Sequence, residues 1–187
     1  MERYTVVKWI HDFIKTKVNI GDSCIDATCG NGNDTLFLCN LVGSNGNVIS
    51  FDIQDIAIEN TEKLLKESNL EGVARLYKTS HENMPDYAEK ESISAIMFNL
   101  GYLPKGDHKI STKSESTINA ISKGLDLLKT GGVMSICIYS GKDSGFEEKE
   151  NVLSYLKQLD KNKYQVIVNQ FYNRPNNPPI PVFIIKC

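Results

Sequence analysis

The chain has 187 residues, enough for one well-buried domain and too few for two ordinary ones, so we expect a single domain over residues 1–187. Its hydrophobic content of 41% and charged content of 24% are typical of a globular protein in water, and no apolar run reaches the roughly 20 residues that cross a bilayer. A net charge of −2 argues against a surface devoted wholly to nucleic acid, but leaves room for a local basic patch.

The N-terminal residues and the cysteines predict a reducing environment. The segment Met1-Glu2-Arg3-Tyr4 lacks a signal-peptide pattern, so we expect a cytoplasmic protein with no membrane partner. The five cysteines are widely spaced and contain no CxxC pair, which predicts neither a disulfide framework nor a zinc site. We therefore expect no bound metal, and we expect Cys24 and Cys137 to be small core residues.

Short β-rich runs alternate with amphipathic helices along the chain, which is typical of an α/β fold. The apolar stripe of Val6, Ile10, Phe13 and Ile14 predicts an opening helix, with Thr5 as its N-cap. The elements expected next are a strand over 23–27, a helix over 33–42, a strand over 48–51 after the Asn45-Gly46 turn, a helix capped by Asp55, and strands over 73–77 and 93–98.

The second half of the chain should contain two helices and end with two strands that no helix connects. Thr112 and Glu115 form a capping-box signature, and the helix that they open should stop at Gly131-Gly132. Two strands joined without a crossover helix run antiparallel. After this helix we expect a strand over 133–139, a helix over 146–159, and strands over 164–171 and 181–185.

About seven strands in a mostly parallel sheet, with an antiparallel last strand and helices on both faces, is the Rossmann-like order of class I methyltransferases. A plain dinucleotide-binding Rossmann sheet ends parallel instead. The pattern therefore favours the methyltransferase fold, although a fold alone does not establish a function.

Gly30-Asn31-Gly32 lies between the first strand and its helix, where a ligand can approach the backbone and free amide donors. This pattern also opens NAD sites, and Asp52 after the second strand could hold the ribose of either cofactor. However, the third glycine of the dinucleotide pattern is replaced by Thr35, and Asp34 would repel a pyrophosphate. S-adenosylmethionine carries an ammonium and a sulfonium, which suit Asp26 and Asp34. Alternatively, Asp34 only complements the helix dipole.

Three further polar residues follow the second and third strands. Gln54 lies where an adenosine edge would pass, and Ser80 and His81 lie where such sites usually meet the adenine. A histidine in this position could equally be a loop or capping residue. We include all three in the predicted cofactor site.

Asn99-Leu100-Gly101-Tyr102 follows the fourth strand. Amine-directed methyltransferases have Asn or Asp here, then Pro-Pro and an aromatic residue, so that acceptor oxygens face the target nitrogen while the ring stacks on the base. Asn99 and Tyr102 keep the outer positions, whereas Leu100-Gly101 replace the prolines and loosen the backbone. The segment suggests an amine substrate, and its other interpretation is a plain loop that leaves a buried strand.

Two groups of residues could act on a substrate. Asp107 and His108 lie in a polar loop near the expected methyl position, where a base could keep an attacking amine neutral; hydrogen bonding within the loop is the alternative. Tyr139 ends the fifth strand, and Arg174 and Asn177 precede the last one. These three could contact a nucleic acid by stacking, phosphate contact and base-edge hydrogen bonds.

With these segments in place, the chain closely resembles a bacterial family long labelled rRNA methylases, whose members are tRNA 5-aminomethyl-2-thiouridine methyltransferases. The resemblance runs nearly end to end, and its combination of motifs is far more specific than one glycine loop. The motifs are DATCGNGNDT at 26–35, FDIQ at 51–54, FNLGYLP at 98–104, GDH at 106–108, GFEEKE at 145–150 and NPP at 177–179.

The resemblance implies that S-adenosylmethionine methylates the 5-aminomethyl nitrogen of 2-thiouridine at the tRNA wobble position. The expected partner is the tRNA anticodon stem-loop, and pairing of two chains in a homodimer could extend a local basic surface. By carry-over, Asn99, Tyr102, Asp107 and His108 would lie near the accepting amine. The complete predicted cofactor site is Asp26, Gly30, Asn31, Gly32, Asn33, Asp34, Asp52, Gln54, Ser80, His81, Asn99 and Gly101.

Other functions stay open from the sequence. The methyl acceptor could be ribosomal RNA or a small-molecule amine. The chain could also be a non-catalytic binding module with the cofactor fold, or an NAD-linked oxidoreductase. The intact polar residues at both the cofactor and the acceptor segments argue against a binding module.

Overall fold

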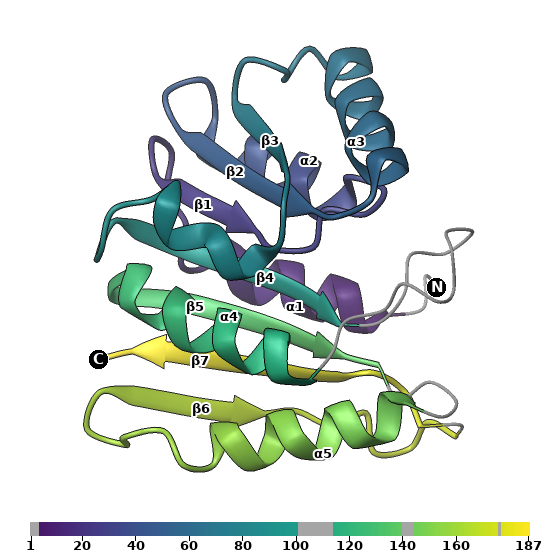
Figure 1. Cartoon of the computed structure of the whole chain (residues 1–187), viewed down its shortest axis with the longest axis vertical. Helices are drawn as coiled ribbons and strands as arrows, with labels where there is room; N and C mark the ends of the chain where they lie inside the picture. The colour runs from purple at the N-terminus through teal and green to yellow at the C-terminus, as the bar shows by residue number, and fades with distance from the viewer. Residues whose placement is uncertain (1–3, 101–113, 140–143, 176) are drawn as a thin grey trace.

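Seven strands form one sheet in the computed structural model, which describes residues 4–100, 114–139, 144–175 and 177–187. The strand order is β3-β2-β1-β4-β5-β7-β6 (Figure 1). The strands are β1 (Ser23–Asp26), β2 (Asn47–Asp52), β3 (Ala74–Lys78), β4 (Ile93–Leu100), β5 (Leu128–Ile138), β6 (Tyr164–Val168) and β7 (Ile180–Lys186).

The first five strands pair in parallel, and β7 lies between β5 and β6 and is antiparallel to both. Since β6 and β7 follow one another without a helix, the predicted reversal at the end of the sheet is confirmed. The carboxyl ends of β1 to β6 therefore share one edge of the sheet, as their arrows show in Figure 1. The predicted fold class, a Rossmann-like class I methyltransferase sheet, is confirmed.

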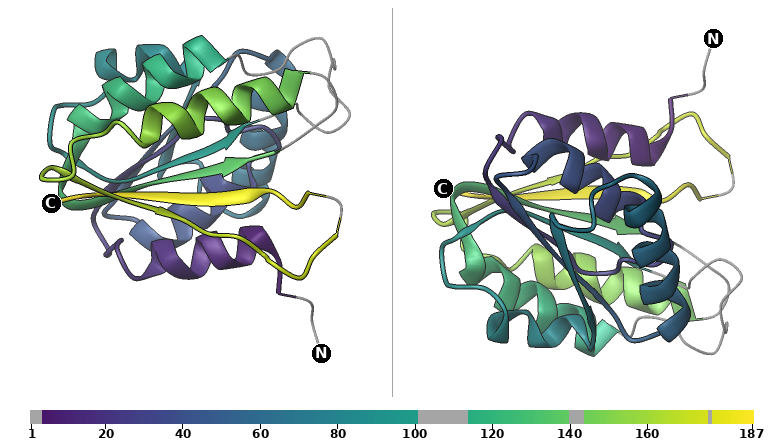
Figure 2. Two further views of the ribbon diagram at one scale, coloured as in Figure 1. Left: turned by 90° about the horizontal axis from the view of Figure 1, so that it is seen from below. Right: turned by 90° about the horizontal axis from the view of Figure 1, so that it is seen from above.

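Helices cover both faces of the sheet, as the two views of Figure 2 show for α1 on one side and α4 and α5 on the other. The helices of the α1 face contribute to one buried cluster, and those of the α4 face to a second one. The first set is α1 (Val6–Lys15), α2 (Asn33–Val42) and α3 (Asp55–Glu67); the second is the 3-10 helix η1 (His81–Asp86), α4 (Ser114–Leu127) and α5 (Ser144–Leu156).

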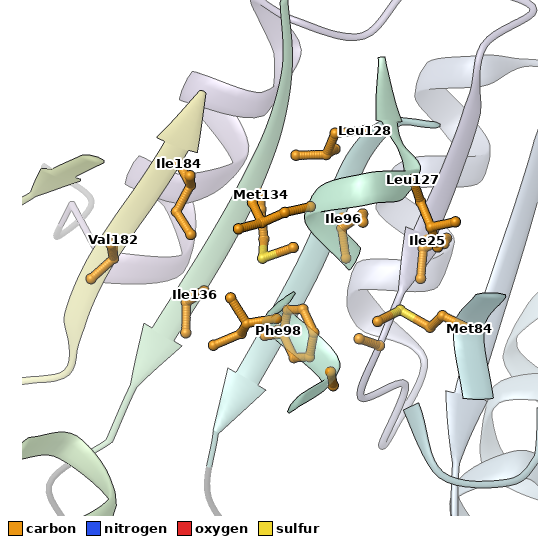
Figure 3. Packing of buried hydrophobic residues seen from close by; sticks show 14 of the residues in the cluster. Ile25, Met84, Ile96, Phe98, Leu127, Leu128, Met134, Ile136, Val182 and Ile184 are labelled. Carbon is orange, nitrogen blue, oxygen red and sulfur yellow. The ribbon is translucent and has the colours of Figure 1, made fainter. Parts of the chain in front are cut away.

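Alternate residues of each central strand enter the two clusters, so these strands are apolar on both faces. Cys24 faces α1 and α2, whereas Ile25 faces η1 and α4. Figure 3 shows the second cluster, in which side chains of β1, β4, β5 and β7 form one apolar layer, with Met84 of η1 and Leu127 of α4 near Ile25 of β1. This burial on both faces fixes the position of the central strands, and with it the place where each of them ends at the edge of the sheet. Cys24 and Cys137 are buried, as predicted.

The junction of α4 and β5 differs from the prediction. We expected the helix to reach Gly131-Gly132, but α4 ends at Leu127 and β5 begins at Leu128. Pairing with β4 overrides the helical pattern, because Ile93 is opposite Leu128 and the register then shifts at a bulge. Gly131 lies in this bulge at a φ of +78°, a conformation that suits glycine.

Smaller differences concern helix starts and strand ends. Asp55, predicted as a cap, is the first residue of α3 and pairs with Lys78, while Gln54 is the N-cap. The short helix η1 was not predicted; Ser80 caps it by accepting a hydrogen bond from the backbone N–H of Glu82. The strand predicted over 164–171 ends at Val168, and the helix predicted over 146–159 spans Ser144–Leu156. The predicted cap Thr112 lies outside the described residues.

The structure contains no helix, in its described ranges, with the length and apolarity to span a membrane.

Gly46 offers a direct test of the turn that leads into β2. A Cβ there would lie 2.3 Å from Cβ of Val42 and 2.7 Å from the carbonyl oxygen of Asp22. We therefore predict that Gly46→Ala lowers the free energy of unfolding by about 1–3 kcal/mol, as overpacking does. The measurement is urea unfolding followed by circular dichroism.

The matched control is Gly72→Ala, because a Cβ at Gly72 would meet no atom within 4 Å. This variant should keep or slightly raise the free energy of unfolding. Equal stability of the two variants would contradict the structure of this turn.

Candidate active site

The glycine loop between β1 and α2 brings bare backbone to the carboxyl edge of the sheet. Gly30 and Gly32 have φ values of +54° and +80°, which side chains disfavour. A Cβ on Gly32 would also lie 3.0 Å from Cα and Oγ1 of Thr61 in α3. Gly32 is the N-cap of α2 and has no side chain to satisfy the first amides of that helix. The loop therefore presents amide donors that a ligand can use.

Asp52, at the end of β2, fastens this loop to the neighbouring strand. Its Oδ2 accepts a hydrogen bond of 3.1 Å from the backbone N–H of Gly30, and its Oδ1 accepts one of 3.0 Å from that of Gln54. A carboxylate has about four acceptor positions, so two backbone bonds leave capacity for a ligand. Asn31, on the exposed side of the loop, accepts a 3.2 Å hydrogen bond from Asn60.

Asp26 lies behind the loop and has no exposed surface. Its Oδ2 accepts a 2.7 Å hydrogen bond from Oγ1 of Thr35, and its Oδ1 accepts one of 3.2 Å from the backbone N–H of Thr28. Burial, followed by the negative charge of Asp34, raises the pKa of Asp26 to about 7. In this position Asp26 holds the loop and the first turn of α2. Its predicted contact with the cofactor stays a prediction.

The carboxylate of Asp34 bridges two residues that are distant in sequence. Nε2 of His11 in α1 lies 2.6 Å from Oδ1 of Asp34 and donates to it, because a carboxylate only accepts. Oδ2 of Asp34 accepts a hydrogen bond from Nδ2 of Asn99 at the end of β4. The ring of His11 is also stacked on Phe37, with centroids 3.7 Å apart. The three elements α1, α2 and β4 are thereby joined at one carboxylate.

These contacts orient the amide of Asn99. Its backbone N–H donates a 2.8 Å hydrogen bond to Oγ1 of Thr28, which follows β1. Because Nδ2 donates to Asp34, the opposite side of the amide carries the Oδ1 acceptor. Asn99 is thus held through both its backbone and its side chain, beside the glycine loop.

His81 and Ser80 are both used within the protein. Nδ1 of His81 lies 3.2 Å from the carbonyl oxygen of Ala27, and its ring packs edge-on against Phe98. Burial lowers the pKa of His81, which favours the neutral ring. Ser80 caps η1. Both residues lie at the carboxyl edge of the sheet, as predicted, and their contacts also fit the structural alternative.

The remaining predicted residues lie either in connections at the carboxyl edge of the sheet or outside the described ranges. Asn33 is the first residue of α2, and Gln54 is the N-cap of α3. Tyr139 follows β5, and 41% of its surface is exposed. Arg174 and Asn177 lie in the connection from β6 to β7, which starts at the same edge of the sheet, and Arg174 donates to the backbone oxygen of Tyr4. Four predicted residues fall outside the described ranges: Gly101, Tyr102, Asp107 and His108. The described residues contain no cluster of three or more His, Cys, Asp or Glu side chains suited to a metal ion.

Comparison with known proteins identifies the family. The sequence model of the family described as "Putative rRNA methylase" matches residues 48–185, which is more than half of the chain. The chain belongs to this family. It is also 38% identical, over 175 residues, to a protein of Arabidopsis thaliana named "tRNA (mnm(5)s(2)U34)-methyltransferase, chloroplastic". That match covers 89% of this chain but 64% of the relative, so the chain spans slightly less than two thirds of that protein.

Solved structures of similar proteins agree with the family assignment. One, titled as a putative rRNA-methylase from Clostridium thermocellum, is 51% identical with a TM-score of 0.96, and each chain covers 100% of the other. A second, titled as a putative methyltransferase from Streptococcus mutans in complex with SAH, is 34% identical with a TM-score of 0.88. The comparison covers 100% of this chain and 99% of that one.

The sequence alone did not reveal three residues that hold the site together, one on the opening helix and two threonines near the glycine loop. His11 was not among the residues predicted for the site, yet its ring bonds to Asp34, 23 residues further along the chain. Thr28 and Thr35 were not named as site residues, although they hold Asn99 and Asp26. The one feature that could have indicated this contact is a polar histidine on the opening helix, because that helix packs near the start of α2.

The raised pKa of Asp26 predicts a dependence of stability on pH. The unfolded carboxyl ionises near its ordinary value of 3.8, and the folded one near 7. Between these values the folded protein keeps a proton that the unfolded chain releases, so the free energy of unfolding falls as pH rises. We predict that this fall is absent in Asp26→Asn when urea unfolding is compared at about pH 5 and about pH 8.

The control is Asp86→Asn, at an exposed position in η1. This variant should follow the wild-type pH dependence. If Asp26→Asn also follows it, Asp26 does not carry the raised pKa.

Proposed function

We propose that this chain is an S-adenosylmethionine-dependent methyltransferase that methylates the 5-aminomethyl nitrogen of 2-thiouridine at the tRNA wobble position. The observation that carries the proposal is the amide of Asn99, fixed by Asp34 and Thr28 beside the glycine loop. An acceptor amide suits an amine substrate. The name of the 38% identical relative in Arabidopsis thaliana, a tRNA mnm5s2U34 methyltransferase, supports the same chemistry.

The residues at the edge fit S-adenosylmethionine. The glycine loop and the uncapped start of α2 offer amide donors, and Asp34 and Asp52 offer negative charge to a ligand with an ammonium and a sulfonium. Asp52 would hold the ribose hydroxyls, and Ile53, which is 54% exposed, offers apolar surface to the adenine. The bound cofactor would supply an activated methyl group. The other residues proposed to hold it are Asp26, Gly30, Asn31, Gly32, Asn33, Gln54, Ser80, His81, Asn99 and Gly101.

The proposed part of this chain in the reaction is alignment. An in-line displacement needs the amine lone pair aimed at the methyl carbon, and positioning supplies most of the rate. Oδ1 of Asn99 would accept an N–H of the amine and so turn its lone pair toward the methyl group. Tyr102 would stack on the base, and Asp107 or His108 would take the proton released by the amine.

The proposed partner is the anticodon stem-loop of tRNA, with Tyr139, Arg174 and Asn177 as further contacts. A homodimer would extend the surface for the RNA. We also propose that residues 1–187 form one domain and that the protein works in the cytoplasm. The second candidate acceptor is rRNA, which the family description favours.

Asp52 provides a test of the cofactor site. Removing its carboxylate by Asp52→Ala would free the loop amide of Gly30 and delete the proposed ribose acceptor. We predict that the Kd for S-adenosylmethionine rises about 10- to 100-fold, the loss expected for hydrogen bonds to a charged group. Titration calorimetry measures it.

Asp55→Ala is the matched control, because Asp55 lies three residues away and makes an exposed ion pair with Lys78. Its Kd should equal that of the wild type. An unchanged Kd for Asp52→Ala would remove Asp52 from the cofactor site.

The function is tested by incubating the purified protein with S-adenosylmethionine and tRNA from a strain that lacks the corresponding gene. Digestion and mass spectrometry should show 5-aminomethyl-2-thiouridine converted to 5-methylaminomethyl-2-thiouridine. Asn99→Ala should lower kcat about a hundredfold, as expected when a reacting group is misaligned. Asn40→Ala, an exposed residue on α2 that bonds to a helical carbonyl, should keep the wild-type rate.

Two results would contradict the proposal. A methyl group transferred to rRNA but not to this nucleoside would favour the second candidate. No transfer to either RNA, although the cofactor binds, would leave a small-molecule amine or a binding module.

A further inference from the structure

A hollow of about 230 Å³ lies between α1 and the segment after β6. Its volume is below the roughly 300–1,000 Å³ of pockets for drug-sized ligands, so it suits one planar ring. The hollow is lined by Tyr4, Trp9, Asn169, Gln170 and Phe171. Three of these five residues are aromatic, and the other two carry amides.

The aromatic walls are held in place by the fold. Trp9 packs edge-on against Phe183 of β7, with ring centroids 6.3 Å apart. The guanidinium of Arg174 lies 4.3 Å from the ring centroid of Phe171 and also donates to the backbone oxygen of Tyr4. Arg174 thus connects two walls and places a positive charge at the hollow.

Asn169 provides a polar group that the protein does not use. Its backbone N–H donates a 2.9 Å hydrogen bond to the carbonyl oxygen of Pro181. Its side-chain Nδ2, in contrast, is buried and has no partner among the described residues. A buried donor without an acceptor costs stability, and such groups call for an explanation. Asn169 is half-buried and lines the hollow, so a ligand there that carries an acceptor atom would satisfy this donor once the amide turns toward it.

The hollow lies at the same edge of the sheet as the candidate active site. Since β5 and β6 are both antiparallel to β7, the carboxyl ends of β5 and β6 point the same way, as Figure 1 shows. Asn169 directly follows β6, and Asn99 lies at the corresponding end of β4. Tyr172, 91% exposed, adds an aromatic ring to the connection that follows the hollow.

We propose that this hollow binds one unpaired nucleobase of the tRNA partner, outside the nucleotide that is methylated. The base would stack on the aromatic walls while Nδ2 of Asn169 donates to an oxygen or nitrogen of its edge, and Arg174 would lie near the RNA backbone. Stacking with base-edge hydrogen bonds is how proteins recognise unpaired RNA bases. The inference rests on the proposed function, since it assumes an RNA partner.

Trp9 makes the inference directly measurable, because it is the single tryptophan of the sequence. An unmodified anticodon stem-loop, labelled at its 5′ end, is titrated with the protein, and its anisotropy reports total binding. The intrinsic fluorescence of Trp9, recorded in a matched titration with unlabelled RNA, reports occupation of the hollow. We expect the fluorescence to be quenched with the same Kd as the anisotropy change.

Asn169→Leu removes the donor and keeps the approximate size of the side chain. Its affinity for the stem-loop should fall about threefold to tenfold, the loss expected for one hydrogen bond, while its Kd for S-adenosylmethionine stays the same. Asn162→Leu is the matched control, since Asn162 is exposed in the turn before β6 and should bind as the wild type does. Tyr4→Ala tests the stacking wall independently if Asn169→Leu does not fold.

The outcomes separate this inference from the function on which it rests. Stem-loop binding that leaves Trp9 fluorescence unchanged, or equal affinity in both wall variants, overturns the hollow as a base site and keeps the proposed function. Fluorescence that changes with protein concentration alone shows that a second copy covers the hollow, which also overturns it. Absence of binding both to this stem-loop and to tRNA from the strain that lacks the corresponding gene contradicts the proposed function itself.

Discussion

The carboxylate of Asp34 joins three elements that lie far apart in the chain. His11 donates to one oxygen and Asn99 to the other, so α1, the start of α2 and the end of β4 meet at one group. The backbone of Asn99 is in turn held by Thr28 of the glycine loop. The proposed cofactor loop and the proposed acceptor amide therefore form one connected unit, and neither can shift without the other.

Concentrating negative charge at this edge has an energetic cost. Burial, followed by the nearby charges of Asp34 and Asp52, raises the pKa of Asp26. The protein offsets this repulsion with hydrogen bonds from Thr35, His11 and Gly30. A cationic ligand would relieve the repulsion further, which is consistent with S-adenosylmethionine and opposed to a pyrophosphate.

The features that the sequence predicts correctly are those that depend on residues close together in the chain. The bounds of α2, the N-cap Thr5 and the reversed last strand are correct because periodicity, capping chemistry and loop length act over a few residues. The start of β5 and the role of His11 depend instead on pairing and contacts across the fold, which override local preference. The hollow beside Trp9 brings together segments more than 150 residues apart, so no local pattern could predict it.

The most direct test of this account is a double-mutant cycle between His11 and Asn99, with kcat for methyl transfer as the measurement. If Asp34 transmits the effect of His11 to the amide, His11→Ala should slow the wild-type enzyme but have little further effect on Asn99→Ala. The coupling free energy should then lie in the range of about 0.5–3 kcal/mol found for residues in one network. Losses that add fully would contradict the account, because His11 would then act independently of Asn99.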